Sequence, residues 1–177
     1  RLFVNMINGG LHAKNNLAFQ EYIVIPRAAS IAGSFDIAKK IFLETEILLK
    51  ARSPNNQVPI GDEGGFMPNF PDNVAPFDLL KEATRDVGAE NDIDLGLDAS
   101  GSNIKIPYKT LEAWYRDAKK EHGLSYLEDP FGENDFDAFA RLQKTFGNTL
   151  TVTGDDLTVT NLTRMKTAHE KQSITGI

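Results

Sequence analysis

Three acidic residues in the second part of the chain each follow a short apolar run. Asp98 ends the run IDLGLD, Glu128 ends LSYLE, and Asp155 follows LTVTG. They are 30 and 27 residues apart, which is about the length of one strand-helix-strand unit. The carboxyl ends of parallel strands lie on one face of a sheet, and neighbouring strands are about 4.8 Å apart. We therefore expect these carboxylates to converge, to repel one another, and to need a hard divalent cation such as Mg²⁺.

A simpler interpretation exists for each acid taken alone. An acidic residue in the loop after a strand is often the N-cap of the next helix. The neighbouring acids, Asp129 and Asp156, are the better candidates for that role, and Asp129 precedes Pro130, which has no N–H to donate. Three acids at regular spacing favour a metal site over three independent caps.

A second group of candidates lies upstream. Glu63 stands between glycines in GDEGG, residues 61–65, where the backbone can approach a ligand closely. His12 follows a glycine-rich loop, and Gln20 and Glu21 open a predicted strand. Each of these also has an ordinary alternative role, as a turn acid, an exposed histidine or a polar strand end.

Short β-rich runs alternate with longer helical patterns and must position these side chains. We predict strands at Glu21–Pro26, Ile93–Asp98 and Leu124–Glu128, a strand from Leu150 to Asp155, and the opening of another at Ile174–Ile177. We predict helices over about Ser34–Ala51 (capped by Ser34), Val74–Gly88, Thr110–His122, Phe136–Phe146 and Leu162–Lys171. Residues Arg52–Phe70 are predicted to form a loop.

This alternation predicts right-handed βαβ units and a parallel sheet, an α/β fold. A barrel of eight units needs roughly 250 residues, so we expect part of a (β/α)8 barrel. A smaller open sheet is the alternative, but no glycine-rich dinucleotide loop supports it.

Composition narrows the class of protein further. The chain has 177 residues, a net charge of -6 and no cysteine, which excludes disulfides and thiolate metal sites and disfavours non-specific binding to nucleic acid or anionic membranes. No apolar run approaches the about 18 residues that span a bilayer. The chain begins at Arg1 with no signal-peptide pattern, so we expect one partial domain, residues 1–177, of a longer cytoplasmic polypeptide.

Taken together, six strings resemble the enolase family and occur in the family's order. They are NGGLHA (8–13), QEY (20–22), GDEGGF (61–66), GLDAS (96–100), LEDPF (127–131) and GDDLTVTN (154–161), and the match covers essentially the whole chain. The resemblance implies an enolase-type barrel without its N-terminal domain and later barrel units. The implied reaction is the reversible dehydration of 2-phosphoglycerate to phosphoenolpyruvate by a Mg²⁺-dependent homodimer.

The resemblance also implies a role for each candidate. Asp98, Glu128 and Asp155 match metal ligands, and Glu63 matches the general acid that assists departure of the hydroxyl group. Glu21 matches its carboxylate partner, and His12 matches a substrate-contacting histidine on a mobile loop. Gln20 supports the site, and Glu21, Glu128 and Asp155 also face the substrate.

The family's proton-abstracting lysine is expected a few residues after Ile177, so we expect no turnover by the 177-residue chain alone. Leu11 stands where the family usually has serine, Lys14-Asn15-Asn16 replaces a glycine-rich stretch, and the segment from Asp98 to Glu128 is short for the family. Two alternatives therefore stay open beside the lyase. One is a non-catalytic enolase-like binding protein, and the other is a related enzyme that abstracts a proton next to a different carboxylate, against which GDDLTVTN and GDEGG argue.

Overall fold

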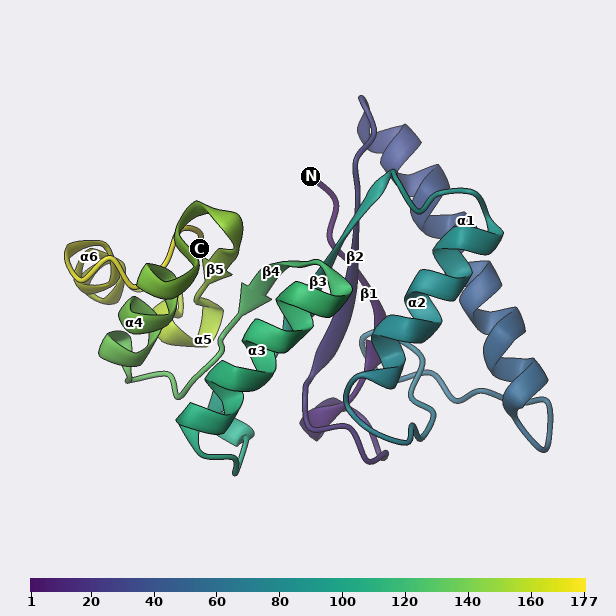
Figure 1. Cartoon of the computed structure of the whole chain (residues 1–177), viewed down its shortest axis with the longest axis horizontal. Coiled ribbons are helices and arrows are strands. Elements are labelled where there is room, and N and C mark those ends of the chain that lie inside the picture. The colour runs from purple at the N-terminus through teal and green to yellow at the C-terminus, as the bar shows by residue number, and fades with distance from the viewer. The chain divides into compact units, whose positions relative to one another are not determined.

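The computed structural model describes all 177 residues, which divide into two compact units, residues 1–96 and 97–177. The elements in chain order are β1 (Val4–Asn8), β2 (Glu21–Pro26), α1 (Ile31–Arg52), α2 (Ala75–Asp86), β3 (Ile93–Asp98), α3 (Tyr108–His122), β4 (Leu124–Glu128), α4 (Phe136–Phe146), β5 (Thr151–Thr153), α5 (Asp155–Thr158) and α6 (Leu162–Glu170), with short 3₁₀ turns at Gly10–His12, Gly101–Asn103 and Gly147–Thr149 (Figure 1). None of the helices has the length and apolar character that crossing a membrane requires.

The first unit is built on β1, β2 and the start of β3, which lie in that order. β1 and β2 are antiparallel, and Asn8 at the end of β1 pairs with Glu21 at the start of β2. The sequence did not predict β1, so the expectation of a parallel sheet is wrong for this pair. The antiparallel pairing places the first residue of β2 beside the carboxyl end of β1.

Helices α1 and α2 pack against each other and against β2 within the first unit (Figure 1). The buried residues of α1 recur at helical spacing, namely Ser34, Ala38, Ile41, Thr45 and Leu49. Its N-cap is Ser30, whose Oγ accepts a hydrogen bond from the N–H of Gly33 at 3.0 Å, so the prediction of Ser34 as the cap is wrong. Gly88 follows α2 in the left-handed conformation (φ +70°), as its predicted role at the C-terminus of that helix requires.

The second unit contains the end of β3, then β4 and β5. β4 and β5 are parallel, as predicted. Thr153 makes an isolated parallel bridge to Gly176, but residues 174–177 do not form the strand that was predicted to open there. β5 ends at Thr153 rather than at Asp155, because residues 155–158 turn into α5. The predicted bounds of β3, β4 and α4 agree with the structure.

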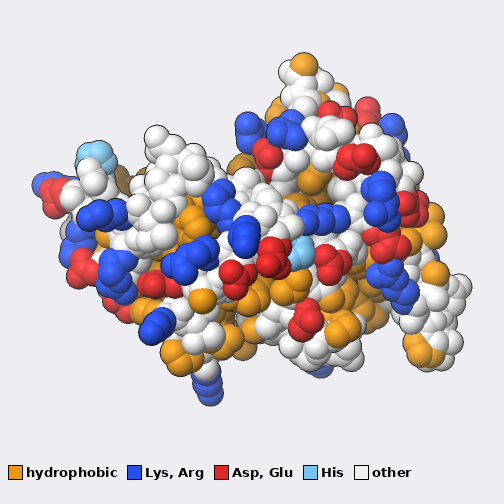
Figure 2. Space-filling model, in the orientation of Figure 1, with side chains coloured by type: hydrophobic (Ala, Val, Ile, Leu, Met, Phe, Trp, Pro, Cys, Tyr) orange, Lys and Arg blue, Asp and Glu red, His pale blue; other side chains and the backbone are white.

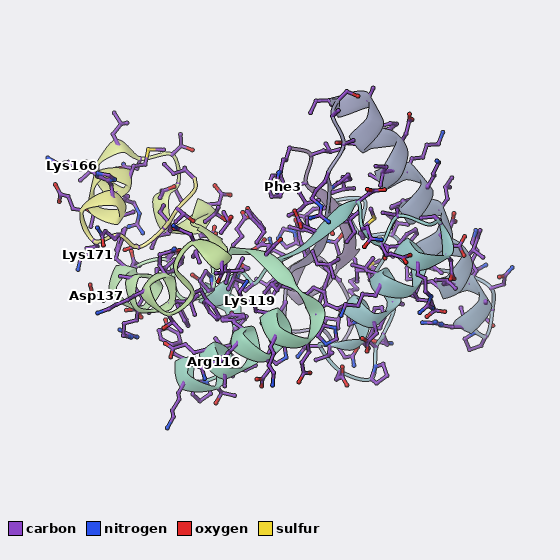
Figure 3. All side chains as sticks on the ribbon, turned by 45° about the horizontal axis from the view of Figure 1, so that its top comes forward. Phe3, Arg116, Lys119, Asp137, Lys166 and Lys171 are labelled. Atoms are coloured by element: carbon purple, nitrogen blue, oxygen red, sulfur yellow. The ribbon has the colours of Figure 1, made fainter.

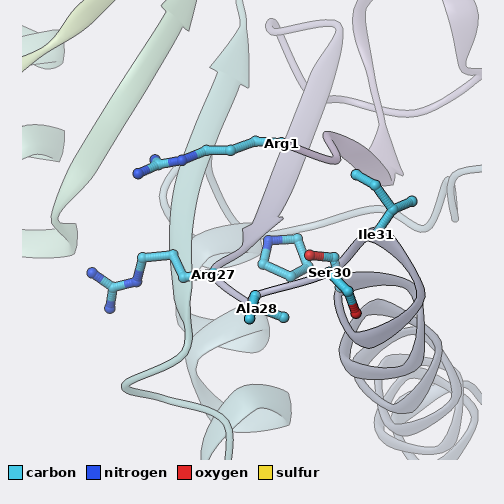
Figure 4. Close-up of a pocket in the computed structure, with 8 residues that line it drawn as sticks. Arg1, Arg27, Ala28, Ser30 and Ile31 are labelled. Carbon is cyan, nitrogen blue, oxygen red and sulfur yellow. The ribbon is translucent and has the colours of Figure 1, made fainter.

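Acidic and basic side chains are interspersed over the face shown in Figure 2, without a continuous patch of one sign. In the second unit, Lys171 donates a hydrogen bond to Asp137 on α4 at 2.5 Å, and the two labelled side chains lie close together in Figure 3. In the first unit, an open hollow near the start of α1 is lined by Arg1, Arg27 and Ser30 among others (Figure 4) and contains none of the predicted site residues.

Candidate functional site

Two of the predicted metal ligands end neighbouring strands of the second unit. Asp98 is the last residue of β3 and Glu128 is the last residue of β4. The backbone N–H of Ala99 donates to the carbonyl of Glu128 at 3.0 Å, which holds the two strand ends together. Carboxylate oxygens of Asp98, Glu128 and Asp129 lie within 4.8 Å of one another. The convergence predicted for Asp98 and Glu128 is therefore confirmed.

The surroundings of Glu128 make its negative charge unfavourable. Burial raises the pKa of Glu128, and the charges of Asp155 and Asp156 raise it further, while a hydrogen bond from Tyr126 lowers it. The Tyr126 hydroxyl donates that bond to Oε2, and burial together with Glu128 keeps the pKa of the phenol well above its ordinary value. A bound cation would relieve this repulsion, because it favours the ionised form of every carboxylate around it.

Asp129 serves mainly as the cap of α5. Its carboxylate accepts backbone N–H bonds from Asp155 at 3.1 Å, Asp156 at 2.8 Å and Leu157 at 3.2 Å. Only 3% of Asp129 is exposed, and its backbone has φ +40°. Burial raises the pKa of this carboxyl to about 7, against the lowering by the N–H donors. The prediction that Asp129 caps the helix after its own strand is wrong, because the N-cap position of α4 is Asp135 and Asp129 instead binds the N–H groups of α5, a whole βα unit further along the chain.

Asp155 and Asp156 occupy the first turn of α5. The prediction that Asp156 caps a helix is wrong, because it lies inside α5 and donates its own N–H to Asp129. Asp155 is exposed, and its charge contributes to the raised pKa of Glu128. The set of oxygens brought within 4.8 Å contains Asp129 in place of Asp155, so Asp155 as a third ligand stays a prediction.

In the first unit, the side chains of His12 and Asn8 both contact Glu63. Oε1 of Glu63 lies 2.7 Å from Nδ1 of His12, and Oε2 accepts a hydrogen bond from Nδ2 of Asn8 at 2.7 Å. The side chains of His12 and Glu63 are 40% and 31% exposed, so a small molecule can reach them, whereas Asn8 is fully buried. The loop of residues 61–65 is held against β1 by the hydrogen bonds of Phe66 with Met6 and Asn8.

Gln20 and Glu21 lie where β2 begins, as predicted. The carbonyl of Gln20 accepts the N–H of Gly9 at 2.8 Å, and Glu21 is half-buried opposite Asn8 in the ladder. Their backbone thus ties the loop that carries His12 to the rim of the first unit. The roles of their side chains toward a substrate remain predictions.

Sequence reasoning assigned no role to Asn8 or Tyr126. Tyr126 lies two residues before Glu128 on β4, and residues at that spacing share a face of a strand. The alternation along LSYLE could therefore have predicted that these two side chains are neighbours. Asn8 contacts a residue 55 positions away, which spacing along the sequence does not reveal.

The fold and these side chains define an α/β domain with clustered carboxylates at its strand ends, an arrangement that suits hard divalent cations. The chain belongs to the family described as the enolase C-terminal TIM barrel domain, whose model matches residues 2–106 and 100–177. It is 36% identical over 188 aligned residues to a protein named enolase from Saccharolobus islandicus (strain M.14.25 / Kamchatka #1). It is 35% identical over 188 residues to an enolase from Saccharolobus solfataricus. Both alignments cover 98% of this chain and 45% of the relative. An enolase from Sulfolobus acidocaldarius is 35% identical over 189 residues, with 98% and 44% covered. The chain thus spans less than half the length of these relatives.

Proposed function

We propose that this chain is the part of a magnesium-dependent lyase that binds the metal and supplies the general acid for dehydration of 2-phosphoglycerate to phosphoenolpyruvate. The observation that carries the proposal is the meeting of Asp98 and Glu128 at adjacent strand ends, with the pKa of Glu128 raised by burial and by neighbouring carboxylates. The family and its relatives named enolase support the same reaction.

The residues present fit magnesium. The candidate donors are all carboxylate oxygens, which this ion prefers, and Asp98 and Glu128 are buried or half-buried rather than fully solvated. Asp98, Glu128 and Asp155 would hold the ion, and Asp129 would fix Asp155 by binding the N–H groups of its helix turn. When bound, the metal would neutralise the charge that develops on the substrate carboxylate as its α-proton leaves.

Glu63 would act as the general acid of the reaction. Hydroxide is a poor leaving group, so its departure from the substrate needs a proton, which Glu63 gives while the C–O bond breaks, and water results. The electrons left by the departing α-proton form the new C–C double bond. The base that takes this proton is the lysine expected from the resemblance. His12 and Glu21 would orient the substrate near Glu63.

A magnesium titration of the full-length protein that contains this chain tests the proposal. We expect Asp98→Asn to weaken magnesium binding at least about tenfold, because one charged ligand is lost, and to abolish formation of phosphoenolpyruvate. Asp117→Asn, an exposed acid on α3, is the matched control and should leave both unchanged. Equal magnesium affinity in the wild type and the Asp98→Asn variant would refute the metal site.

A non-catalytic enolase-like binding protein is the second candidate. Leu11, beside His12 on the surface loop, is 73% exposed and stands where the resemblance implies a serine, so this loop offers a substrate no hydroxyl at that position. Magnesium binding by the full-length protein without any turnover of 2-phosphoglycerate would favour this function over the lyase. Assembly as a homodimer and a cytoplasmic location belong to the lyase proposal and are supported only by the resemblance.

A further inference from the structure

Asn8 makes two side-chain hydrogen bonds whose polarity is fixed. Its Oδ1 accepts the backbone N–H of Gly65 at 3.0 Å, and its Nδ2 donates to Oε2 of Glu63 at 2.7 Å. A backbone N–H can only donate, so the amide oxygen must face Gly65. The amide nitrogen therefore faces Glu63, and the reverse orientation would bring two donors together at Gly65.

This orientation decides which oxygen of Glu63 can carry a proton. Oε2 accepts the N–H of Asn8, and a carbonyl or carboxylate oxygen is a stronger acceptor than a hydroxyl oxygen, so this bond favours a carboxyl proton on Oε1. Oε1 lies 2.7 Å from Nδ1 of His12, which accepts when it is not protonated and donates when it is. The two contacts therefore favour the exchangeable proton between Oε1 and Nδ1 over a position on Oε2.

Asn8 has no room to turn away from these partners. Its side chain is fully buried, its backbone N–H donates to Phe66 at 2.8 Å, and its carbonyl accepts from Asn15 at 2.9 Å. A Cβ atom on Gly65 would lie 2.5 Å from Oδ1 of Asn8, and one on Gly61 would lie 3.0 Å from the same atom. The glycines thus allow the loop to close on the amide and leave it in a single position.

We propose that Asn8 is a positioning residue for the general acid: its amide holds the Glu63 carboxyl in one orientation and keeps the acidic proton on Oε1, on the side of His12. This inference rests on the proposed role of Glu63 in dehydration. In that step the proton leaves the Oε1–Nδ1 pair and joins the departing hydroxyl to give water. The carboxylate that remains is stabilised by the N–H of Asn8.

Two variants of the full-length protein test this role. Asn8→Leu keeps the approximate volume and removes the donor, and Asn8→Asp keeps an acceptor for Gly65 but sets an oxygen against Oε2. We expect kcat for dehydration to fall about ten- to a hundredfold in both, with KM changed less than about threefold, since a hydrogen bond to the acid and not to the substrate is lost. Asn161→Leu, which loses only the bonds that its side chain accepts from the backbone N–H groups of Thr163 and Arg164 at the start of α6, is the structural control and should leave kcat unchanged.

Nitrogen NMR of the His12 ring in the ligand-free protein gives a readout that does not need turnover. The wild type and Asn161→Leu should show the same balance of Nδ1–H and Nε2–H tautomers at a given pH. Asn8→Leu should shift this balance toward Nε2–H, because a Glu63 carboxylate that lacks the N–H donor at Oε2 holds a proton more tightly and Nδ1 then accepts. A His12 tautomer balance in Asn8→Leu equal to that of the wild type would overturn the proposal, as would a kcat within twofold of the wild type. If Asn8→Leu does not fold, Asn8→Asp decides by the same two measurements. Absence of turnover in the wild type would refute the lyase function, and the tautomer comparison would still decide the role of Asn8.

Discussion

Asp129→Asn should change how the stability of the protein depends on pH. Burial raises the pKa of Asp129 from 3.8 to about 7. The folded state therefore holds a proton that the unfolded state releases, and the associated stability is present below about pH 4 and lost as pH rises through about 7. Asparagine does not titrate, so the variant should lack this loss.

The size of the change in stability follows from the size of the pKa shift of Asp129. About three pKa units at about 1.4 kcal/mol each give at most about 4 kcal/mol, which corresponds to a change of several degrees in Tm. Asparagine keeps one acceptor for the N–H groups of α5 but loses the other oxygen, which costs about 1 kcal/mol at every pH. The wild type should thus be the more stable protein below about pH 4, and the variant should be the more stable one above about pH 7.

Calorimetric Tm values between pH 4 and pH 8, measured with EDTA on the full-length protein, provide the assay. The quantity to compare is the difference between Asp129→Asn and the wild type, because other groups that titrate contribute equally to both. Added Mg²⁺ should reduce the difference at high pH, since a nearby cation favours the ionised carboxyl. A difference in Tm that stays constant across this pH range would refute the reasoning.

Three further changes have defined outcomes. Gly65→Ala places a Cβ 2.5 Å from Oδ1 of the buried Asn8 and should destabilise the protein by about 1–3 kcal/mol, seen as a lower Tm, while an unchanged Tm would show that the loop can shift. Asn16→Ala removes hydrogen bonds in both directions with the backbone of Phe70 and should cost about 1–2 kcal/mol in urea unfolding, whereas no change in the midpoint would mean that water replaces them. Lys171→Met breaks an exposed ion pair with an acid on α4 and should leave Tm nearly unchanged at neutral pH; a large decrease would mean that the lysine stem packs more than its exposure suggests.

Local sequence patterns predicted most of the elements of the second unit. β3, β4 and α4 agree in their bounds because each has a clear period and a clear break at both ends. β1 was missed because the run VNMIN contains two asparagines and no alternation, and its strand conformation comes from pairing with β2. Serine is a favoured residue type at an N-cap, so both Ser30 and Ser34 are suitable. The structure identifies Ser30 as the cap, because its Oγ accepts the backbone N–H of Gly33.

The candidate site also contains contacts that the sequence predicted and contacts that it did not. The strand-end positions of Asp98 and Glu128 follow from the length of one βα unit, so spacing along the sequence predicted their convergence. The cap that Asp129 provides for α5 and the bond from Asn8 to Glu63 join residues 26–28 and 55 positions apart, respectively. Contacts between residues so far apart in the sequence depend on how loops pack against the sheet, and the periodicity of the sequence does not predict them.

The asparagines in Lys14-Asn15-Asn16 give a physical account of the departure from the family's glycine-rich stretch. Asn15 donates to the carbonyl of Pro68 at 3.0 Å, and Asn16 exchanges two hydrogen bonds with the backbone of Phe70. These bonds tie the loop after His12 to the segment after Glu63. Glycine could not make them, because it has no side chain to donate or accept. Any closing movement of this loop over a substrate must either break these bonds or carry both segments together, so the asparagines favour a preformed His12–Glu63 pair over one assembled on binding.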